Sequence, residues 1–275
     1  MLRRTLYPGF AAITLCTSLI LSACGGSSSS TTTTSGGAPT TLKAGLYEAK
    51  ILYVNGAPPK AATTYLSPTG NFAAVFGGSA GLTLGNLAFA NMRISGTSHD
   101  YRQLDPGQPD PKGFFEDKGA EQGVITGTIT SQESATFSTA DALGQVSTSV
   151  TLQRVNSLSD LVISLGNASG TYVSRVEGQS DVSLTVNGNG SLYSEYYRQA
   201  TGCVLQGTET VSIPDNSINV FNITYTMSSC NNDNVNRNGE YSGVGFFGPM
   251  QDQSMRMVFA ADNGTVAMRF DGVNK

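Results

Sequence analysis

From Leu42 to the C-terminus, the chain alternates short apolar runs with turns that are rich in Gly, Asn, Asp and Pro. Strands of about four to eight residues produce this pattern, and no long segment after the N-terminal region shows the 3.6-residue period of an amphipathic helix. The low charged content, 13%, and the many Gly, Ser and Thr residues suit a protein of many turns. The sequence therefore predicts an all-β fold with little helix, built of antiparallel meanders in a barrel or a sandwich.

The strand pattern starts again near the middle of the chain. Gly170–Val173 (Gly-Thr-Tyr-Val) matches Gly45–Glu48 (Gly-Leu-Tyr-Glu), and each is followed by a predicted hairpin, whose turn in the first half is Ser67–Gly70. We therefore expect two small β-lobes, residues 42–160 and 161–275. A single larger β structure is the alternative, because the identity between the halves is low and the spacings drift.

The segment from Leu87 to Ser95 alternates along what we expect to be one strand. One face would carry Leu87, Phe89, Asn91 and Arg93, and the other Ala88, Ala90, Met92 and Ile94. The second set is the more consistently apolar, so we expect it to face the core.

The N-terminus has the features of an export signal. Arg3 and Arg4 precede an apolar run from Ala11 to Leu21, which is too short to span a bilayer of about 30 Å as a helix. Leu21-Ser22-Ala23-Cys24 then resembles the bacterial lipobox, in which a diacylglycerol is attached to the cysteine and a peptidase cuts just before it. The resemblance implies a signal peptide over residues 1–23 and three acyl chains on a mature chain that begins at Cys24. An ordinary secretory signal with an unrelated cysteine is the alternative.

Residues 25–41 contain only Gly, Ser, Thr, Ala and Pro, which predicts a flexible linker between the lipid and the folded body. Because each buried CH₂ contributes about 0.8 kcal/mol, several acyl chains anchor such a body stably. By analogy with enteric sorting, Gly25 and Gly26 after the cysteine favour the outer membrane. The sequence leaves open whether the body faces the periplasm or the cell surface.

The charge of the chain argues against one class of partner. The formal net charge is −4, and loss of Arg3 and Arg4 with the signal leaves 14 Lys and Arg against 20 Asp and Glu, a charge of −6. A mildly acidic body without a basic cluster is not typical of a nucleic-acid-binding protein.

Two cysteines remain for the folded body. Cys16 lies in the signal and Cys24 carries the lipid, which leaves Cys203 and Cys230. An even pair in an oxidising compartment predicts a disulfide. Two buried thiols or half of a metal site are the alternatives, and the single histidine and lack of a CxxC motif argue against the metal site.

The second half carries a recognisable series of motifs. In order they are Gly170-Thr171-Tyr172, Asn187-Gly188-Asn189-Gly190, Thr201-Gly202-Cys203, Gly207, Asn222, Cys230 and Tyr241-Ser242-Gly243. The series resembles a group of uncharacterised proteobacterial outer-membrane lipoproteins. The resemblance implies a β-meander domain with one disulfide and carries no assigned activity.

A second likeness is confined to a short turn. Gly245-Phe246-Phe247-Gly248-Pro249 is similar to a turn in the C-terminal barrels of transferrin-binding protein B and factor H-binding lipoproteins. Those proteins continue with Ala and Glu-x-Gly-Gly, whereas Met250-Gln251-Asp252-Gln253 follows here. The likeness implies binding to a host protein, and this departure leaves it as an analogy.

Residues 98–122 form the most charged stretch and hold the single histidine, His99, beside Asp100 and Tyr101. No SxxK motif accompanies His99, and we assign no catalytic residues. One interpretation is a long solvated loop between strands. The other is a recognition loop, in which Phe114 and Phe115 form an exposed anchor.

The segment Asn231–Glu240 alternates oxygen-bearing side chains in a manner that suits Ca²⁺. Aligned with an EF-type loop, however, it places Gly245 where a bidentate Glu is needed. We interpret the segment as an Asn- and Gly-rich turn and expect no metal or cofactor.

These observations favour a non-enzymatic lipoprotein of the outer membrane, which acts by binding a protein or small ligand or as an envelope scaffold. A surface receptor or adhesin for a host protein is the first alternative. An envelope hydrolase is the second.

Overall fold

The computed structural model describes residues 41–77, 81–103, 113–117, 122–175, 181–206, 210–249 and 254–275. The predicted signal peptide, Cys24 and the linker up to residue 40 lie outside these residues. Among the helices described, none is long and apolar enough to cross a membrane.

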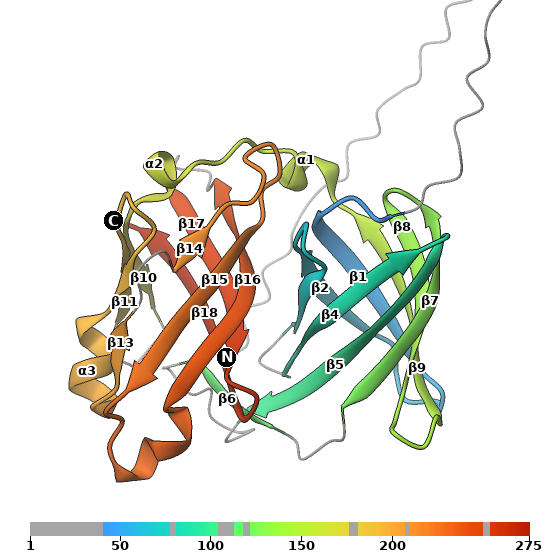
Figure 1. Cartoon of the computed structure of the whole chain (residues 1–275), viewed down its shortest axis with the longest axis horizontal. Helices are drawn as coiled ribbons and strands as arrows, with labels where there is room; N and C mark the ends of the chain where they lie inside the picture. The colour runs from blue at the N-terminus through green and yellow to red at the C-terminus, as the bar shows by residue number, and fades with distance from the viewer. Residues whose placement is uncertain are drawn as a thin grey trace, which may run out of the picture. The chain divides into compact units, whose positions relative to one another are not determined.

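Eight strands of the N-terminal half form a closed antiparallel barrel (Figure 1, blue to green). They are β1 (Gly45–Tyr53), β2 (Lys60–Leu66), β3 (Asn71–Phe76), β4 (Leu82–Ala90), β5 (Arg93–Gln103), β7 (Gly123–Ser131), β8 (Ser134–Ala140) and β9 (Val146–Arg154). Each strand pairs with the next, with β5 paired to β7. Pairing of β1 with β9 closes the barrel, and its register runs from Tyr47↔Arg154 to Tyr53↔Thr148.

The C-terminal half forms a second, nearly closed antiparallel barrel (Figure 1, yellow to red). Its strands are β10 (Gly170–Ser174), β11 (Val182–Val186), β12 (Leu192–Tyr193), β13 (Val204–Gln206), β14 (Val211–Ser212), β15 (Phe221–Ser228), β16 (Gly239–Pro249), β17 (Met255–Asp262) and β18 (Val266–Asn274). The meander β15–β18 returns to β10, which continues into β11 and β12, while β13 and β14 both pair with β15. The predicted all-β fold with two small antiparallel lobes is confirmed.

The helices in the described part of the chain are short, as the sequence predicts. α1 (Asn156–Ser159) and α2 (Leu165–Ala168) lie in the connection between the barrels. α3 (Glu195–Thr201) follows β12 and packs against β11 and β13. The 3₁₀ helix η1 (Asn232–Arg237) occupies most of the segment that we considered as a calcium loop.

Three strands begin with the same Gly-x-Tyr sequence, at Gly45–Tyr47 in β1, Gly170–Tyr172 in β10 and Gly239–Tyr241 in β16. In each, the glycine has a φ between 137° and 152°, which a side chain rarely adopts. Each tyrosine is buried, and its hydroxyl donates a hydrogen bond to the carbonyl oxygen four residues upstream. The match between Gly45–Glu48 and Gly170–Val173 therefore reflects a shared local structure that begins each barrel.

The buried side chains form one core in each barrel and a third cluster between them. The C-terminal barrel is filled by large side chains such as Tyr172, Tyr225 and Phe259. The cluster between the barrels includes Tyr65 of β2 and Phe246 of β16, whose ring centroids lie 5.0 Å apart. The barrels therefore share a continuous apolar contact within one compact unit.

A short strand from the first half, β6 (Phe114–Asp117), pairs with β5 of the N-terminal barrel and with β18 of the C-terminal barrel. Phe114 lies in the C-terminal core with 0% of its surface exposed, and Phe115 lies in the cluster between the barrels with 6% exposed. The prediction that these rings form an exposed anchor is wrong. Successive residues of a strand point to opposite faces, and here both faces are covered.

The predicted single strand from Leu87 to Ser95 is a hairpin. The chain turns at Asn91 and Met92, whose φ angles are 51° and 64°, between β4 and β5. Of the four residues predicted to face the core, only Ile94 is buried. A two-residue turn with positive φ at both positions is common for Asn but rare for Met. The turn between β4 and β5 was therefore not predicted from the sequence.

Candidate ligand-binding site in the N-terminal barrel

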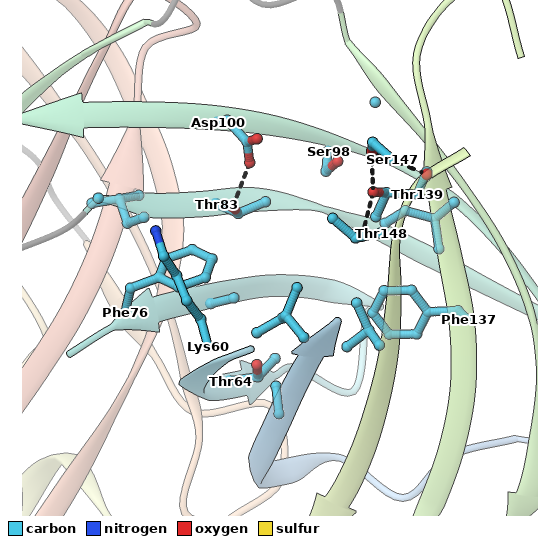
Figure 2. A pocket seen from close by; sticks show the side chains of 18 of the residues that line it. Lys60, Thr64, Phe76, Thr83, Ser98, Asp100, Phe137, Thr139, Ser147 and Thr148 are labelled. Carbon is cyan, nitrogen blue, oxygen red and sulfur yellow. Dashed lines mark hydrogen bonds between the residues drawn. The ribbon is translucent and has the colours of Figure 1, made fainter. Parts of the chain in front are cut away.

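The N-terminal barrel is packed at one end and hollow at the other. A cavity of about 440 Å³ occupies the end at which β1 finishes and β2 begins. All eight strands contribute to its wall, and Figure 2 shows the side chains that converge on it. Apolar groups such as Ile51, Phe76, Phe137 and Val150 make up much of the lining.

The hollow follows from the size of the inward-facing residues. Inward positions recur at every second residue of a strand, so β1 turns Tyr47, Ala49 and Ile51 to the interior in succession. Near the closed end these positions hold large residues, such as Tyr47 and Leu66, which pack into the barrel core. Farther along the strands, several of these positions hold small residues, such as Ala49, Thr64 and Ala74, between larger ones. Small residues on neighbouring strands leave the space unfilled.

Lys60, the first residue of β2, lies at the mouth of the cavity. Its ammonium nitrogen lies 5.8 Å from the ring centroid of Tyr53 and 5.9 Å from that of Phe76, at distances typical of cation–π contacts (Figure 2). In the described part of the chain, Lys60 forms no ion pair. The mouth therefore presents one cation that is held by aromatic rings alone.

Two carboxylates at the same mouth accept hydrogen bonds from the protein. Asp100 accepts one from the hydroxyl of Thr83, with 2.5 Å between the oxygens. Asp141 accepts backbone N–H bonds from Leu143 and Gln145, at 3.0 and 2.8 Å, in the turn after β8. Burial raises the pKa of Tyr53, and the negative charge of Asp100 raises it further. This phenol therefore stays protonated at neutral pH.

The hydroxyl groups of the cavity wall fall into two kinds. On one wall, Thr139 exchanges hydrogen bonds with Ser147 at 3.0 Å and with Thr148 at 2.6 Å (Figure 2). Thr64 is different, because it is only 4% exposed and its Oγ1 has no hydrogen-bond partner among the residues that the structure describes. An unsatisfied buried hydroxyl costs about 1–3 kcal/mol. The Thr64 hydroxyl can therefore still donate and accept a hydrogen bond, whereas much of the rest of the wall is apolar or already hydrogen-bonded.

The structure does not bring the sequence-predicted binding residues into one site. Asp100 and Tyr101 line the cavity, whereas His99 lines a separate polar pocket of about 230 Å³. The ring of His99 packs edge-on to that of Tyr101, with centroids 5.9 Å apart. Phe114 and Phe115 are buried elsewhere. Whether residues 98–122 recognise a partner stays a prediction.

Sequence reasoning missed Lys60, Thr64 and the cavity itself. The one local signal was a few small residues at alternate positions, Ala62 and Thr64 in β2 and Ala74 in β3. Such residues indicate a cavity only when the strands across the barrel are known and also lack large side chains at the facing positions.

The predicted disulfide lies away from this cavity. Cys203 and Cys230 are bonded, and they join the segment after α3 to the end of β15 in the C-terminal barrel. Within the residues described, no group of three or more His, Cys, Asp or Glu side chains is placed to hold a metal ion.

Comparison with known proteins adds little to this description. No protein-family model and no curated protein matches the chain. Among solved structures it is similar to Aeromonas veronii immune modulator A, with a TM-score of 0.36 and 12% identity over 86% of this chain and 96% of that one. A likeness at this TM-score carries no functional conclusion.

Proposed function

We propose that this protein is a non-catalytic lipoprotein of the bacterial outer membrane and that its N-terminal barrel binds a small, largely apolar molecule. The observation that supports the binding role is the cavity of about 440 Å³ at the open end of that barrel. Ligand sites commonly measure about 300–1,000 Å³ and combine an apolar wall with a few placed polar groups, and the mouths of β-barrels are frequent locations.

The contrast between the barrels supports the same proposal. The C-terminal barrel has aromatic side chains throughout its interior, including Tyr197, Phe221 and Phe247, and α3 and a disulfide brace it. The N-terminal barrel leaves a cavity of about 440 Å³ in its interior, which costs packing energy that a large side chain would recover. A site for a ligand accounts for that cost.

The proposed anchor is compatible with access to the cavity. The chain enters the N-terminal barrel at its closed end, where Leu42 packs into the core beside Tyr47 and Leu66. The cavity mouth lies at the other end of β1, near Tyr53. The predicted linker from Cys24 would therefore join the body at the end of the barrel opposite the mouth.

A neutral fluorescent probe, N-phenyl-1-naphthylamine, tests the binding role. We expect its fluorescence to rise on addition of the protein and to saturate at one site per chain. Ala74→Leu fills the cavity and should abolish most of this signal, whereas Ala61→Leu, on the exposed side of β2, should leave it unchanged. Absence of saturable binding, or equal binding by both variants, would reject the proposal.

Mass spectrometry of the mature N-terminus tests the anchor. The proposal predicts a peptide that begins at Cys24 and carries acyl chains, and it predicts that Cys24→Ala moves the protein from the membrane to the soluble fraction. An unmodified N-terminus at another residue would remove the membrane part of the proposal and leave the binding role to be judged separately.

A further inference from the structure

We infer that the ligand of the N-terminal barrel is an amphiphile with an anionic head group, which Lys60 binds at the mouth, and with an oxygen atom in its buried part, which the Thr64 hydroxyl binds. The inference rests on the proposed function and adds the chemical class of the ligand.

We infer the charge of the head group from the charged residues at the mouth and from their polar partners. Asp100 is paired with the Thr83 hydroxyl, and Asp141 holds two backbone N–H groups of its own turn. Among the described residues, Lys60 contacts the rings of Tyr53 and Phe76 and forms no ion pair. A carboxylate would add a charge-assisted hydrogen bond to Lys60, whereas an amine would bind to carboxylates whose Oδ1 atoms already accept hydrogen bonds.

The position of Lys60 suits a head group at the water boundary. Lys60 is exposed, and its methylene chain runs along the aromatic side chains at the rim of the cavity. An anionic group there keeps part of its hydration and the apolar remainder of the ligand lies among Ile51, Phe76 and Val150. This arrangement avoids the large cost of burying an unpaired charge.

Thr64 supplies a second and independent polar contact. It lies four residues after Lys60 on the same inward face of β2, about 13 Å farther along the strand. Thr64 lines the cavity, and its Oγ1 is buried in the wall without a hydrogen-bond partner among the described residues (Figure 2). A ligand with a hydroxyl or carbonyl oxygen at that depth pairs this group, and a plain hydrocarbon chain does not.

Four ten-carbon probes separate these contributions by isothermal titration calorimetry: decan-1-ol, decylamine, decanoate and 10-hydroxydecanoate. We expect decanoate to bind about tenfold more tightly than decan-1-ol or decylamine, as one charge-assisted hydrogen bond allows. We expect 10-hydroxydecanoate to bind about fivefold more tightly than decanoate through Thr64.

Two variants with matched controls assign the contributions to residues. Lys60→Met should weaken decanoate binding about tenfold and change decan-1-ol binding less than twofold, whereas Lys50→Met, on the outer side of β1, should change neither. Thr64→Val should remove the advantage of 10-hydroxydecanoate and leave decanoate unchanged, whereas Thr63→Val, on the outer side of β2, should preserve the advantage.

The outcomes distinguish this inference from the proposed function. If decan-1-ol and N-phenyl-1-naphthylamine both fail to bind, the proposed function fails. If they bind but decylamine equals decanoate, or Lys60→Met has no effect on decanoate, the anionic head group is refuted. If 10-hydroxydecanoate binds no better than decanoate, the role of Thr64 is refuted.

Discussion

The ring of Phe114 lies edge-on against the ring of Tyr197, with centroids 5.7 Å apart, although the two residues belong to different halves of the chain. The guanidinium of Arg237 lies 4.0 Å from the centroid of the same Phe114 ring. A residue from the connection between β5 and β7 thus completes the core of the C-terminal barrel. This contact and the pairing of β6 with β18 couple the two barrels.

The first prediction concerns that coupling. Phe114→Ala removes a fully buried ring and should lower the free energy of unfolding by about 3–5 kcal/mol. Chemical denaturation followed by tyrosine fluorescence measures the change. Leu143→Ala, at a position that is 86% exposed, serves as the control and should shift stability by less than about 0.5 kcal/mol. A loss below about 1 kcal/mol for Phe114→Ala would show that β6 does not complete this core.

Loss of the disulfide should destabilise the C-terminal barrel. Cys203 and Cys230 are 27 residues apart, and closure of such a loop stabilises a fold by about 3.5 kcal/mol in the chain-entropy model. We expect the double variant Cys203→Ser/Cys230→Ser to show a loss of that size in urea denaturation. An oxidised protein and a reduced one with the same unfolding midpoint would contradict the prediction.

Acid should weaken one ion pair at the closed end of the N-terminal barrel. Asp160 accepts hydrogen bonds from the buried guanidinium of Arg154 at 2.8 and 3.2 Å and from Lys43 at 2.9 Å, and these bonds, led by that of Arg154, lower its pKa from 3.8 to about 2. A carboxyl group with a lowered pKa in the folded state stabilises the fold above its unfolded pKa and loses that effect as the pH falls.

The stability difference between the wild-type protein and Asp160→Asn should therefore be constant above about pH 5 and shrink between about pH 4 and pH 2. Urea denaturation at pH 6, 4 and 2.5 measures this trend. A difference that does not change with pH would mean that the carboxylate of Asp160 is not the group that pairs with Arg154.

The unpaired hydroxyl of Thr64 should cost stability when no ligand is bound. Thr64→Val keeps the shape of the side chain and removes the hydroxyl, so we expect the ligand-free variant to be about 1 kcal/mol more stable than the wild type. Thermal denaturation of delipidated protein tests this. A variant that is less stable than the wild type would indicate that the hydroxyl already has a partner.

Local features of the fold were predictable from the sequence, because turns and strand starts depend on neighbouring residues. The Ser67–Gly70 turn joins β2 to β3, and the matching segments at Gly45 and Gly170 each begin a barrel. The turn at Asn91 and Met92 was missed because Met is an uncommon residue there. Strand β6 was missed because Phe114 packs into the core of the C-terminal barrel and Phe115 into the cluster between the barrels, and no local pattern encodes that arrangement.

The cavity required the whole barrel to be known. Its wall combines small inward-facing residues from strands that are distant in sequence, such as Ala49 of β1 and Thr148 of β9. Lys60 and Thr64 can be assigned to one site only when the face of β2 that carries both is known to point into the barrel. His99 drew attention as the single histidine, yet the neighbouring Asp100 and Tyr101 are the residues that line the cavity.

Titration of isotopically labelled protein with decanoate, followed by NMR spectroscopy, tests the central claim most directly. We predict saturable shifts of amide signals from the cavity wall, including Ile51, Thr64, Ala74 and Val150, while signals from the C-terminal core around Phe259 stay in place. Shifts spread over both barrels, or no shifts at saturating decanoate, would contradict a ligand site inside the N-terminal barrel.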